Sequence, residues 1–411
     1  MIIEEIKNEK LGLCVSGGLD SKTVAKKLVD AGADVMCYSA DLAQPDEDDI
    51  SNVAAKMAPC GVETIIVDLK EQMADACITM IKAQATYDGG YWNSTGIARA
   101  VTVEGLIPVM KENGRTVLVH GATGRGNDQM RFERYTNVLA PEMKIYAPWR
   151  DPQLLQEFPG RKEMAEYLEA AGIPATVGLP KRYSTDANLA GISYEAEDLE
   201  SLETPCSIVE PQMGVWPMDA PDETEEVIIK FEKGIPVEIN GKAVTPLEAM
   251  TEANVIGGRN GVGMKNALEN RIIGTKSRGV YESPGMELIS EALLKIYQAT
   301  MDKSATTLFN QLSRLVAGQV YDGRYFDPVT TAALAAIDVL AEHASGVVNV
   351  GLYKGNVLFN SLTDCPASLY NEADSSMEAS DGLNPVSSQG YAEILSVEAK
   401  SLAMARQIRK S

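Results

Sequence analysis

Residues that bind zinc or form disulfide frameworks are scarce in this chain. It has two histidines, and its six cysteines are scattered with no CxxC pair. Structural zinc sites need such residues in clusters, so we expect no zinc and reduced structural thiols. No window approaches the ~18 uncharged apolar residues of a membrane-spanning helix. The first ten residues, MIIEEIKNEK, are charged rather than signal-like. These absences together predict a cytoplasmic protein with no membrane partner.

Positive charge is also in short supply. The chain has 37 Lys and Arg against 58 Asp and Glu, a formal net charge of -21. This balance argues against nucleic acid as a partner, because a phosphate backbone demands a basic surface. An anionic small molecule would have to bind where basic residues cluster locally, against an unfavourable overall field. The clusters are Lys22, Arg99, Arg125 with Arg131, Lys181 with Arg182, and Lys276 with Arg278.

In the first half of the chain, short runs of β-forming residues alternate with helical stretches. With 411 residues and 45% hydrophobic content, the chain can form two or three domains. The expected helices cover about 21–31, 46–57, 71–84 and 97–112. The expected strands are Leu11–Val15, Val35–Ser39, Glu63–Val67, Thr116–Val119 and Met143–Ala147. This order predicts an α/β fold with a parallel sheet, helices on both faces, and ligands beyond the carboxyl ends of the strands.

The pattern changes from about residue 175. Turn-rich stretches, a short strand pair around 226–239 and longer helices after 285 predict a second, α+β domain. Residues 347–359 alternate like strands around Lys354-Gly355-Asn356, a plausible hairpin turn. Residues 391–410 have apolar positions at helical spacing. This terminal helix would pack either on a second subunit or on its own chain, and the sequence leaves both open.

Ser16-Gly17-Gly18-Leu19-Asp20-Ser21 lies between the first apolar run and the first helical pattern. Two glycines allow the backbone to turn sharply and approach a ligand, and the helix that follows offers unpaired N–H groups to an anion. SGGxDS resembles the loop of ATP pyrophosphatases, which cleave ATP between the α and β phosphates. An ordinary Gly-Gly turn is the alternative.

A second motif runs from His120 to Arg131. It contains three glycines, a hydroxyl, two amides, a carboxylate and two guanidiniums within twelve residues. A loop of this composition is suited to binding a zwitterionic or anionic small molecule. Neither the dinucleotide fingerprint GxGxxG nor a GxxxxGK[ST] P-loop is present. We expect His120 itself to be a packed residue at the end of a strand rather than an acid or base.

Five motifs in order resemble the argininosuccinate synthase family: SGGLD at 16–20, GATGRGNDQ at 121–129, APWR at 147–150, NLAGISYE at 188–195 and ENRIIGTKSRGVYESPG at 269–285. The resemblance implies an ATP-dependent ligase that adenylates citrulline and condenses it with aspartate, giving argininosuccinate, AMP and pyrophosphate. It also implies Mg²⁺, not assigned to protein side chains, and a homotetramer. The implied divisions are an ATP-binding domain of the adenine nucleotide alpha hydrolase-like type (1–172), a synthetase domain (173–365) and an oligomerisation segment (366–411).

The resemblance also assigns roles to residues. Asp20, Ser21, Asp128 and Arg131 would be catalytic. Aspartate would be bound by Thr123, Asn127 and Asp128, with Asp128 on its ammonium. The ATP-binding set is Cys14, Val15, Ser16, Gly17, Gly18, Leu19, Asp20, Ser21, Lys22, Ala40, Gly121, Gly124 and Gly126. The citrulline-binding set is Tyr91, Gly96, Asn127, Arg131, Ser184, Ser193, Glu269 and Tyr281, in which Arg131 suits a carboxylate and Glu269 an ammonium.

Several positions depart from the family pattern. Lys22 adds a cation after Ser21. Gly96 stands where the family has serine or alanine, and Ala100 stands where it has proline. Met264 and Asn266 stand where the family tends to carry Arg and Asp near the acceptor pocket. A few substitutions in a polar pocket can redirect specificity without touching catalysis. Two alternatives therefore stay open: a paralogue that uses another ureido or amide acceptor or another amine, and a nucleotide-binding regulatory protein without turnover.

Overall fold

The computed structural model describes residues 1–47, 49–175, 182–378 and 384–407. Contacts group the chain into two compact units, Met1–Ala367 and Ser368–Ser411. The division predicted within the first unit, at residue 172, stays a prediction. Within the described residues no helix is both long and apolar enough to cross a membrane. Lys181, one of the basic residues noted in the sequence, lies outside the described residues.

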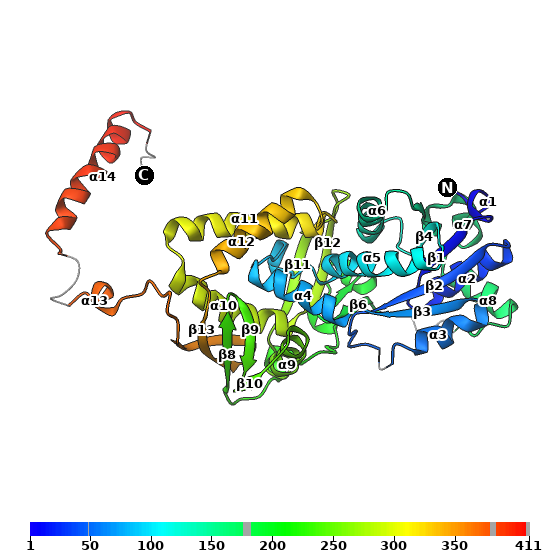
Figure 1. The fold of residues 1–411 in the computed structure, drawn as a ribbon, viewed down its shortest axis with the longest axis horizontal. Helices are drawn as coiled ribbons and strands as arrows, with labels where there is room; N and C mark the ends of the chain where they lie inside the picture. The colour runs from blue at the N-terminus through cyan, green and yellow to red at the C-terminus, as the bar shows by residue number, and fades with distance from the viewer. Residues whose placement is uncertain (48, 176–181, 379–383, 408–411) are drawn as a thin grey trace. The chain divides into compact units, whose positions relative to one another are not determined.

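The first sheet contains five parallel strands in the order β3-β2-β1-β4-β5 (Figure 1). They are β1 (Lys10–Cys14), β2 (Asp34–Asp41), β3 (Glu63–Asp68), β4 (Val117–His120) and β5 (Lys144–Tyr146). All five strands predicted from the sequence are present. The chain leaves β1 towards β2 on one side and later returns to β4 on the other, so β1 and β4 border the topological switch point, the usual place for a ligand.

Helices cover both faces of this sheet. One face packs with α2 (Leu19–Asp30), α3 (Asn52–Met57) and α8 (Arg161–Ala170). The other packs with α4 (Lys70–Lys82) and α5 (Ser94–Glu112). Two shorter helices, α1 (Ile3–Ile6) and α7 (Pro152–Glu157), and the site helix α6 (Asp128–Leu139) complete this half.

Two details of these helices differ from the sequence-based expectation. The helix expected at 46–57 begins only at Asn52, because the Asp49 carboxylate accepts the Ser51 N–H and forms a turn before it. Helix α6 was not predicted at all. Its buried positions include Gln129 and Arg131, so its inward face does not look apolar in the sequence.

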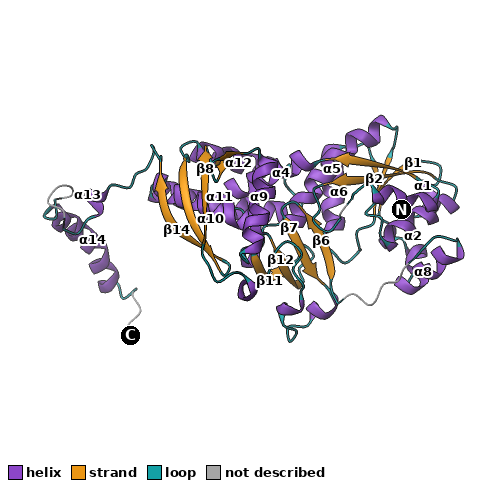
Figure 2. Ribbon diagram, turned by 90° about the horizontal axis from the view of Figure 1, so that it is seen from below, coloured by secondary structure: helices purple, strands orange, loops and turns teal. Residues whose placement is uncertain are grey.

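Two antiparallel sheets follow (Figure 2). The first has the strand order β10-β9-β8-β13-β14 and contains β8 (Glu225–Glu232), β9 (Ile235–Ile239), β10 (Lys242–Ala243), β13 (Gly346–Tyr353) and β14 (Asn356–Thr363). Strands β8 and β9 confirm the predicted strand pair, and β13 and β14 confirm the predicted hairpin. The order β11-β12-β7-β6 joins β6 (Ser184–Asn188), β7 (Gly191–Glu195), β11 (Met264–Asn270) and β12 (Lys276–Glu282). The sequence did not predict this second sheet, because its strands are rich in Asn, Asp, Ser and Lys, which are uncommon in strands.

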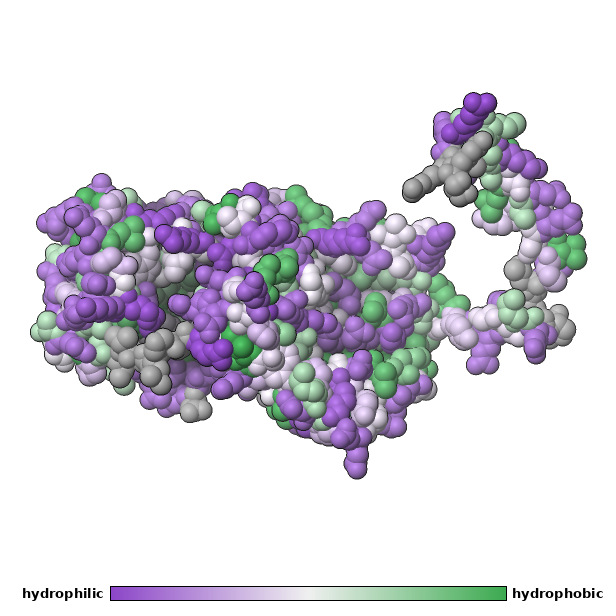
Figure 3. Space-filling model, turned by 180° about the vertical axis from the view of Figure 1, so that it is seen from behind, coloured by the Kyte–Doolittle hydropathy of each residue, from purple (hydrophilic) through white to green (hydrophobic). Residues whose placement is uncertain are grey.

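Long helices complete the first unit: α9 (Pro246–Arg259), α10 (Pro284–Thr300), α11 (Lys303–Tyr321) and α12 (Pro328–Ala341). One hydrophobic core is shared by α4 and α5 with α9, α10 and α11, so the halves of this unit are packed together. Hydrophilic side chains cover most of the face of this unit drawn in Figure 3. The second unit contains α13 (Glu372–Ser375) and α14 (Ser387–Met404), the predicted terminal helix.

Gly191 at the start of β7 is a point where only glycine fits. Its φ is +149°, and a Cβ placed there would fall on the carbonyl oxygen of Glu282 and on Ser283 Oγ. Gly318 in α11 has open space around it. We expect Gly191→Ala to lower the free energy of unfolding by about 3 kcal/mol, because β7 must move away from β12. Gly318→Ala, the matched control, should raise it by about 0.5–1 kcal/mol. Urea unfolding of both variants tests this, and an unchanged Gly191→Ala would contradict the close approach.

Candidate functional site

The two glycine-rich loops lie next to each other at the switch point. Cys14 at the end of β1 is paired with His120 at the end of β4, so the loops that follow them leave adjacent strands. The first loop leads into α2 and the second into α6. Parallel strands therefore bring the two motifs to the same edge of the sheet, as the sequence predicted.

The first loop presents backbone N–H groups. Gly17 has φ +76°, which favours glycine, and Gly18 is the N-cap of α2 without a side-chain cap. Ser16 N–H donates to Ser21 Oγ at 3.1 Å, which closes the turn. Burial raises the pKa of Asp20 in the first turn of α2, and Arg161 opposes this shift. An uncapped N-terminus of this kind is suited to phosphate groups.

Four further residues predicted for ATP lie near this loop. The ammonium of Lys22 donates to the Pro174 carbonyl at 3.1 Å, so its contact lies away from the loop glycines. Burial raises the pKa of the Cys14 thiol to about 12, which Arg99 partly opposes. The thiol is therefore protonated and inert near neutral pH. Val15 and Ala40 are buried near the carboxyl ends of β1 and β2.

A cavity of about 220 Å³ opens beside the second loop. It collects side chains from segments that are far apart in the sequence. From the predicted set it is lined by Tyr91, Gly121, Thr123, Gly126, Asn127, Asp128, Arg131, Ser193, Glu269 and Tyr281. It is also lined by Thr95, Ala122, Asp186, Glu195, Arg271 and Tyr321, which the sequence analysis did not select. Glu195 and Arg271 belong to two of the five motifs that resemble the family. Thr95, Asp186 and Tyr321 belong to none of these motifs, so the sequence did not point to them.

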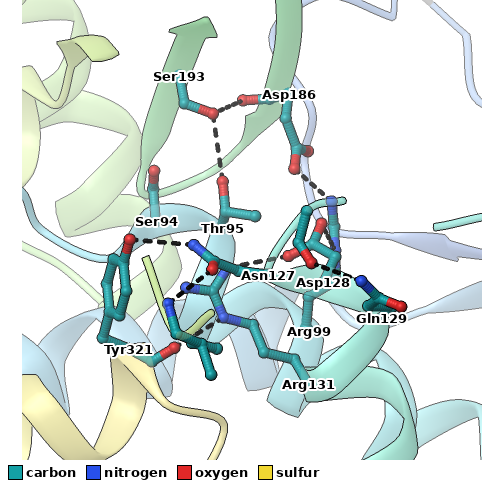
Figure 4. Close-up of polar contacts among 12 residues, drawn as sticks. Ser94, Thr95, Arg99, Asn127, Asp128, Gln129, Arg131, Asp186, Ser193 and Tyr321 are labelled. Atoms are coloured by element: carbon teal, nitrogen blue, oxygen red, sulfur yellow. Dashed lines mark hydrogen bonds and ion pairs between the residues drawn. The ribbon is translucent and has the colours of Figure 1, made fainter. Parts of the chain in front are cut away.

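An ion network forms the floor of this cavity (Figure 4). Asp128 accepts from Arg99 Nε and from Arg131 Nη1, each at 2.9 Å. Arg99 also pairs with Asp186. Burial acts to raise the pKa of Asp128, but the two guanidiniums outweigh it and hold that pKa below its usual range. Burial raises the pKa of Asp186, and Arg99 and a hydrogen bond with Thr95 only partly oppose this shift.

Arg131 is buried and keeps one donor free. Its Nε donates to the Tyr321 carbonyl at 3.0 Å, and its guanidinium lies 5.0 Å from the centre of the Tyr321 ring. Its Nη2 is buried without a hydrogen-bond partner in the described residues. A buried guanidinium nitrogen without a partner is costly, so this atom is suited to an anionic ligand group such as a carboxylate.

Glu269 lies across the cavity among tyrosines. Tyr281 donates its hydroxyl to Glu269 Oε2 and Tyr321 donates to Oε1, both at 3.0 Å. Tyr91 stacks on Tyr281 with ring centres 4.0 Å apart. Burial raises the pKa of Glu269, and the two tyrosine hydroxyls and Arg131 oppose it. A carboxylate on one side and a free guanidinium nitrogen on the other fit the ammonium and carboxylate of an amino acid.

Other predicted residues lie outside this cavity. Ser184 is exposed at the start of β6, and Gly124 lies in the second loop. Gly96 is buried behind Arg131, where a Cβ would lie 3.7 Å from Arg131 Cζ and 3.2 Å from the Val320 carbonyl oxygen.

Met264 and Asn266 were expected near the acceptor pocket, and this expectation is wrong. Residues alternate between the two faces of a strand, so these two lie on the opposite face of β11 from Glu269. Met264 packs with a small separate cluster, and Asn266 is exposed. Neither lines the cavity. Of the four departures at Gly96, Ala100, Met264 and Asn266, Gly96 lies close to Arg131.

Comparisons with known proteins agree with this geometry. The arginosuccinate synthase N-terminal HUP domain matches residues 10–174, and the C-terminal domain of the same family matches residues 183–402. The chain belongs to the argininosuccinate synthase family. A protein named argininosuccinate synthase from Rhodopirellula baltica is 41% identical over 385 residues, covering 93% of this chain and 95% of its own. The proteins of the same name from Thermotoga maritima and Caldanaerobacter subterraneus are 37% and 36% identical to this chain. The first match covers 95% of this chain and 97% of the relative, and the second covers 98% of each.

His120 precedes the second loop and is packed, as expected. It is fully buried, its ring stacks on Phe132 at 5.2 Å, and neither ring nitrogen has a hydrogen-bond partner in the described residues. Burial, with a smaller contribution from Arg150, lowers its pKa to about 4. The imidazole is therefore neutral in the folded protein near neutral pH.

This buried histidine predicts a loss of stability in acid. The unfolded chain binds the proton below pH ~6.5, whereas the folded chain does so only below about 4. Stability therefore falls as the pH drops through this window, by about 2 kcal/mol between pH 6.5 and 5. We expect His120→Phe to remove this part of the pH dependence in urea unfolding. His343→Gln, at the other, exposed histidine, should retain it, and equal slopes in the two variants would contradict the assignment.

Proposed function

We propose that this chain condenses citrulline with aspartate at the expense of ATP, giving argininosuccinate, AMP and pyrophosphate, a reaction of arginine biosynthesis. The observation that carries the proposal is the cavity between the second loop and Glu269, in a chain that matches its family over nearly its whole length. The paralogue and regulatory alternatives have no observation in their favour. Of the departures from the family pattern that bear on the acceptor, Gly96 lies beside Arg131, outside the cavity lining.

ATP would occupy the switch point. The N–H groups of the first loop and of the first turn of α2 would hold the phosphates, with Ala40 beside the adenine and Gly121 to Gly126 over the nucleotide. The described residues contain no group of three His, Cys, Asp or Glu side chains that could hold a metal. Mg²⁺ is usually bound by substrate phosphates and one or two carboxylates, and we propose that Asp20 would supply one. When bound, the ion neutralises charge on the phosphates.

The two amino acids would share the cavity. Arg131 Nη2 would receive the carboxylate of citrulline and Glu269 its ammonium, with Tyr91, Ser193 and Tyr281 around it. Asp128 would pair with the ammonium of aspartate, and Thr123 and Asn127 would donate hydrogen bonds to its carboxylates. These assignments are supported by the unpaired nitrogen of Arg131 and by the ionised state that two guanidiniums give Asp128.

The chemistry would proceed in two displacements. The ureido oxygen of citrulline attacks the α-phosphorus, and pyrophosphate leaves. The amine of aspartate, after losing a proton, attacks the activated ureido carbon, and AMP leaves. The protein contributes alignment of three substrates and stabilisation of charge on the phosphate, rather than a covalent intermediate of its own.

We also propose a cytoplasmic homotetramer. The C-terminal unit supports a role in association, because α14 has apolar residues and buries none of them within that unit. Light scattering on the full chain would report the mass. A monomer would overturn this proposal.

Product analysis tests the function directly. The protein is incubated with ATP, Mg²⁺, citrulline and aspartate, and AMP, pyrophosphate and the condensed product are measured. We expect equal amounts of all three over many turnovers, and no condensed product when either amino acid is omitted. Formation of ADP would refute the mechanism, and pyrophosphate with a different acceptor alone would favour the paralogue.

Two carboxylate variants separate the steps. Asp20→Asn should reduce citrulline-dependent exchange of pyrophosphate into ATP by at least 100-fold, because the phosphate side of ATP loses its carboxylate. Asp128→Asn keeps the size of the side chain and an acceptor oxygen for the guanidiniums, so it should leave this exchange within about threefold. It should reduce argininosuccinate formation about 100-fold, since the lost charge-assisted pair with the aspartate ammonium is worth roughly 3 kcal/mol. Equal loss of exchange in the two variants would contradict the assigned roles.

A further inference from the structure

Tyr321 stands between the two amino-acid subsites without a role in the reaction described so far. It is the last residue of α11, it is fully buried, and its side chain lines the cavity. Its ring stacks on Tyr87 with centres 3.8 Å apart. The residues that its hydroxyl contacts lie 52 and 194 positions away in the sequence, so only the fold brings them together.

The hydroxyl of Tyr321 has a definite direction. It donates its one proton to Glu269 Oε1 and accepts from Asn127 Nδ2, both at 3.0 Å (Figure 4 shows the Asn127 contact). Burial raises the pKa of this phenol, so it keeps its proton. A carboxylate can only accept and an amide NH₂ can only donate, which leaves no other arrangement.

This contact fixes the orientation of the Asn127 amide. Asn127 Oδ1 accepts from Ile272 N–H at 3.0 Å, and Nδ2 faces Tyr321. The two contacts agree on which side of the amide is oxygen. One hydrogen on Nδ2 remains for a ligand carboxylate.

The backbone of Tyr321 is held separately from its hydroxyl. Its carbonyl accepts from Arg131 Nε at 3.0 Å. Helix α11 also lies close against α5. Asn93 donates to the Ala317 carbonyl at 3.0 Å, and a Cβ on Gly96 would lie only 3.2 Å from the Val320 carbonyl oxygen. Removing the hydroxyl alone should therefore leave both the helix and Arg131 in place.

We propose that the Tyr321 hydroxyl is a positioning group that couples the two amino-acid subsites, because it holds the Asn127 amide and the Glu269 carboxylate together in the orientations that bind substrate. The inference rests on the proposed function. It assigns one group to both amino acids: Asn127 binds the aspartate carboxylate, and Glu269 binds the citrulline ammonium. The loss of this hydroxyl should weaken both without affecting ATP.

Tyr321→Phe tests this with steady-state kinetics. We expect the KM values for citrulline and for aspartate each to rise about tenfold, because each subsite loses one hydrogen bond that orients a binding group. The KM for ATP should stay within twofold, since no part of the first loop contacts Tyr321. A purely structural role would instead raise all three KM values together, or lower the thermal midpoint without changing any of them.

The matched control is Tyr297→Phe. Tyr297 is also a buried tyrosine, in α10, and its hydroxyl donates one hydrogen bond, to the Lys82 carbonyl at 2.8 Å. It does not line the cavity. We expect a loss of stability similar to that of Tyr321→Phe with all three KM values unchanged. Tyr321→His, which keeps an aromatic ring, is the second variant should Tyr321→Phe not fold, and the same paired rise in KM is expected.

The outcomes separate the two proposals. An active wild type whose Tyr321→Phe variant keeps both amino-acid KM values within twofold overturns the inference and leaves the proposed function intact. A rise for only one amino acid overturns the coupling. A wild type that forms no argininosuccinate overturns the proposed function, and the inference falls with it.

Discussion

The carboxylate of Asp128, held between Arg99 and Arg131, is the interaction on which the site depends. Charges withdrawn from water are costly unless each has a partner, and here each guanidinium contributes to the ionised state of the same carboxylate. The network joins α5, α6 and, through Asp186, the strand β6. Removing one partner would leave a poorly hydrated charge behind. The network therefore fixes both the shape of the cavity floor and the relation between the parallel sheet and the sheet of β6, β7, β11 and β12.

Each part of the first unit contributes a different element of the site. The parallel sheet brings two glycine loops to one edge, where their N–H groups suit phosphate. The sheet of β6, β7, β11 and β12 contributes Ser193, Glu269 and Tyr281. Helix α11 contributes Tyr321, which contacts residues of both. The parallel sheet and α11 share one hydrophobic core, whereas the sheet of β6, β7, β11 and β12 packs in two smaller clusters, one of which contains Tyr321. The distances between the contributed groups are therefore held by packing rather than by a loop.

The departures from the family pattern have unequal consequences. Met264 and Asn266 lie on the face of β11 opposite Glu269, so they change that face and not the cavity. Gly96 lies against Arg131 and the backbone of Val320, where any side chain would press on α11. The close approach of α5 and α11 is thus a property of this particular sequence. It positions the Tyr321 carbonyl that accepts the Arg131 Nε.

The parallel sheet, both glycine loops and most of the cavity lining could be predicted from the sequence. Apolar runs separated by helical patterns specify a parallel sheet, and such a sheet places successive loops at one edge. Motifs of consecutive residues then identified Asn127, Asp128, Arg131 and Glu269.

The remaining elements and contacts of the site depend on how distant segments pack together. Helix α6 and the sheet of β6, β7, β11 and β12 escaped prediction because their inward faces carry polar site residues, which hide the apolar period. Pairs such as Arg99 with Asp186, or Tyr321 with Asn127, lie 87 and 194 positions apart. No local pattern encodes such contacts, since they arise when separate segments pack into one core.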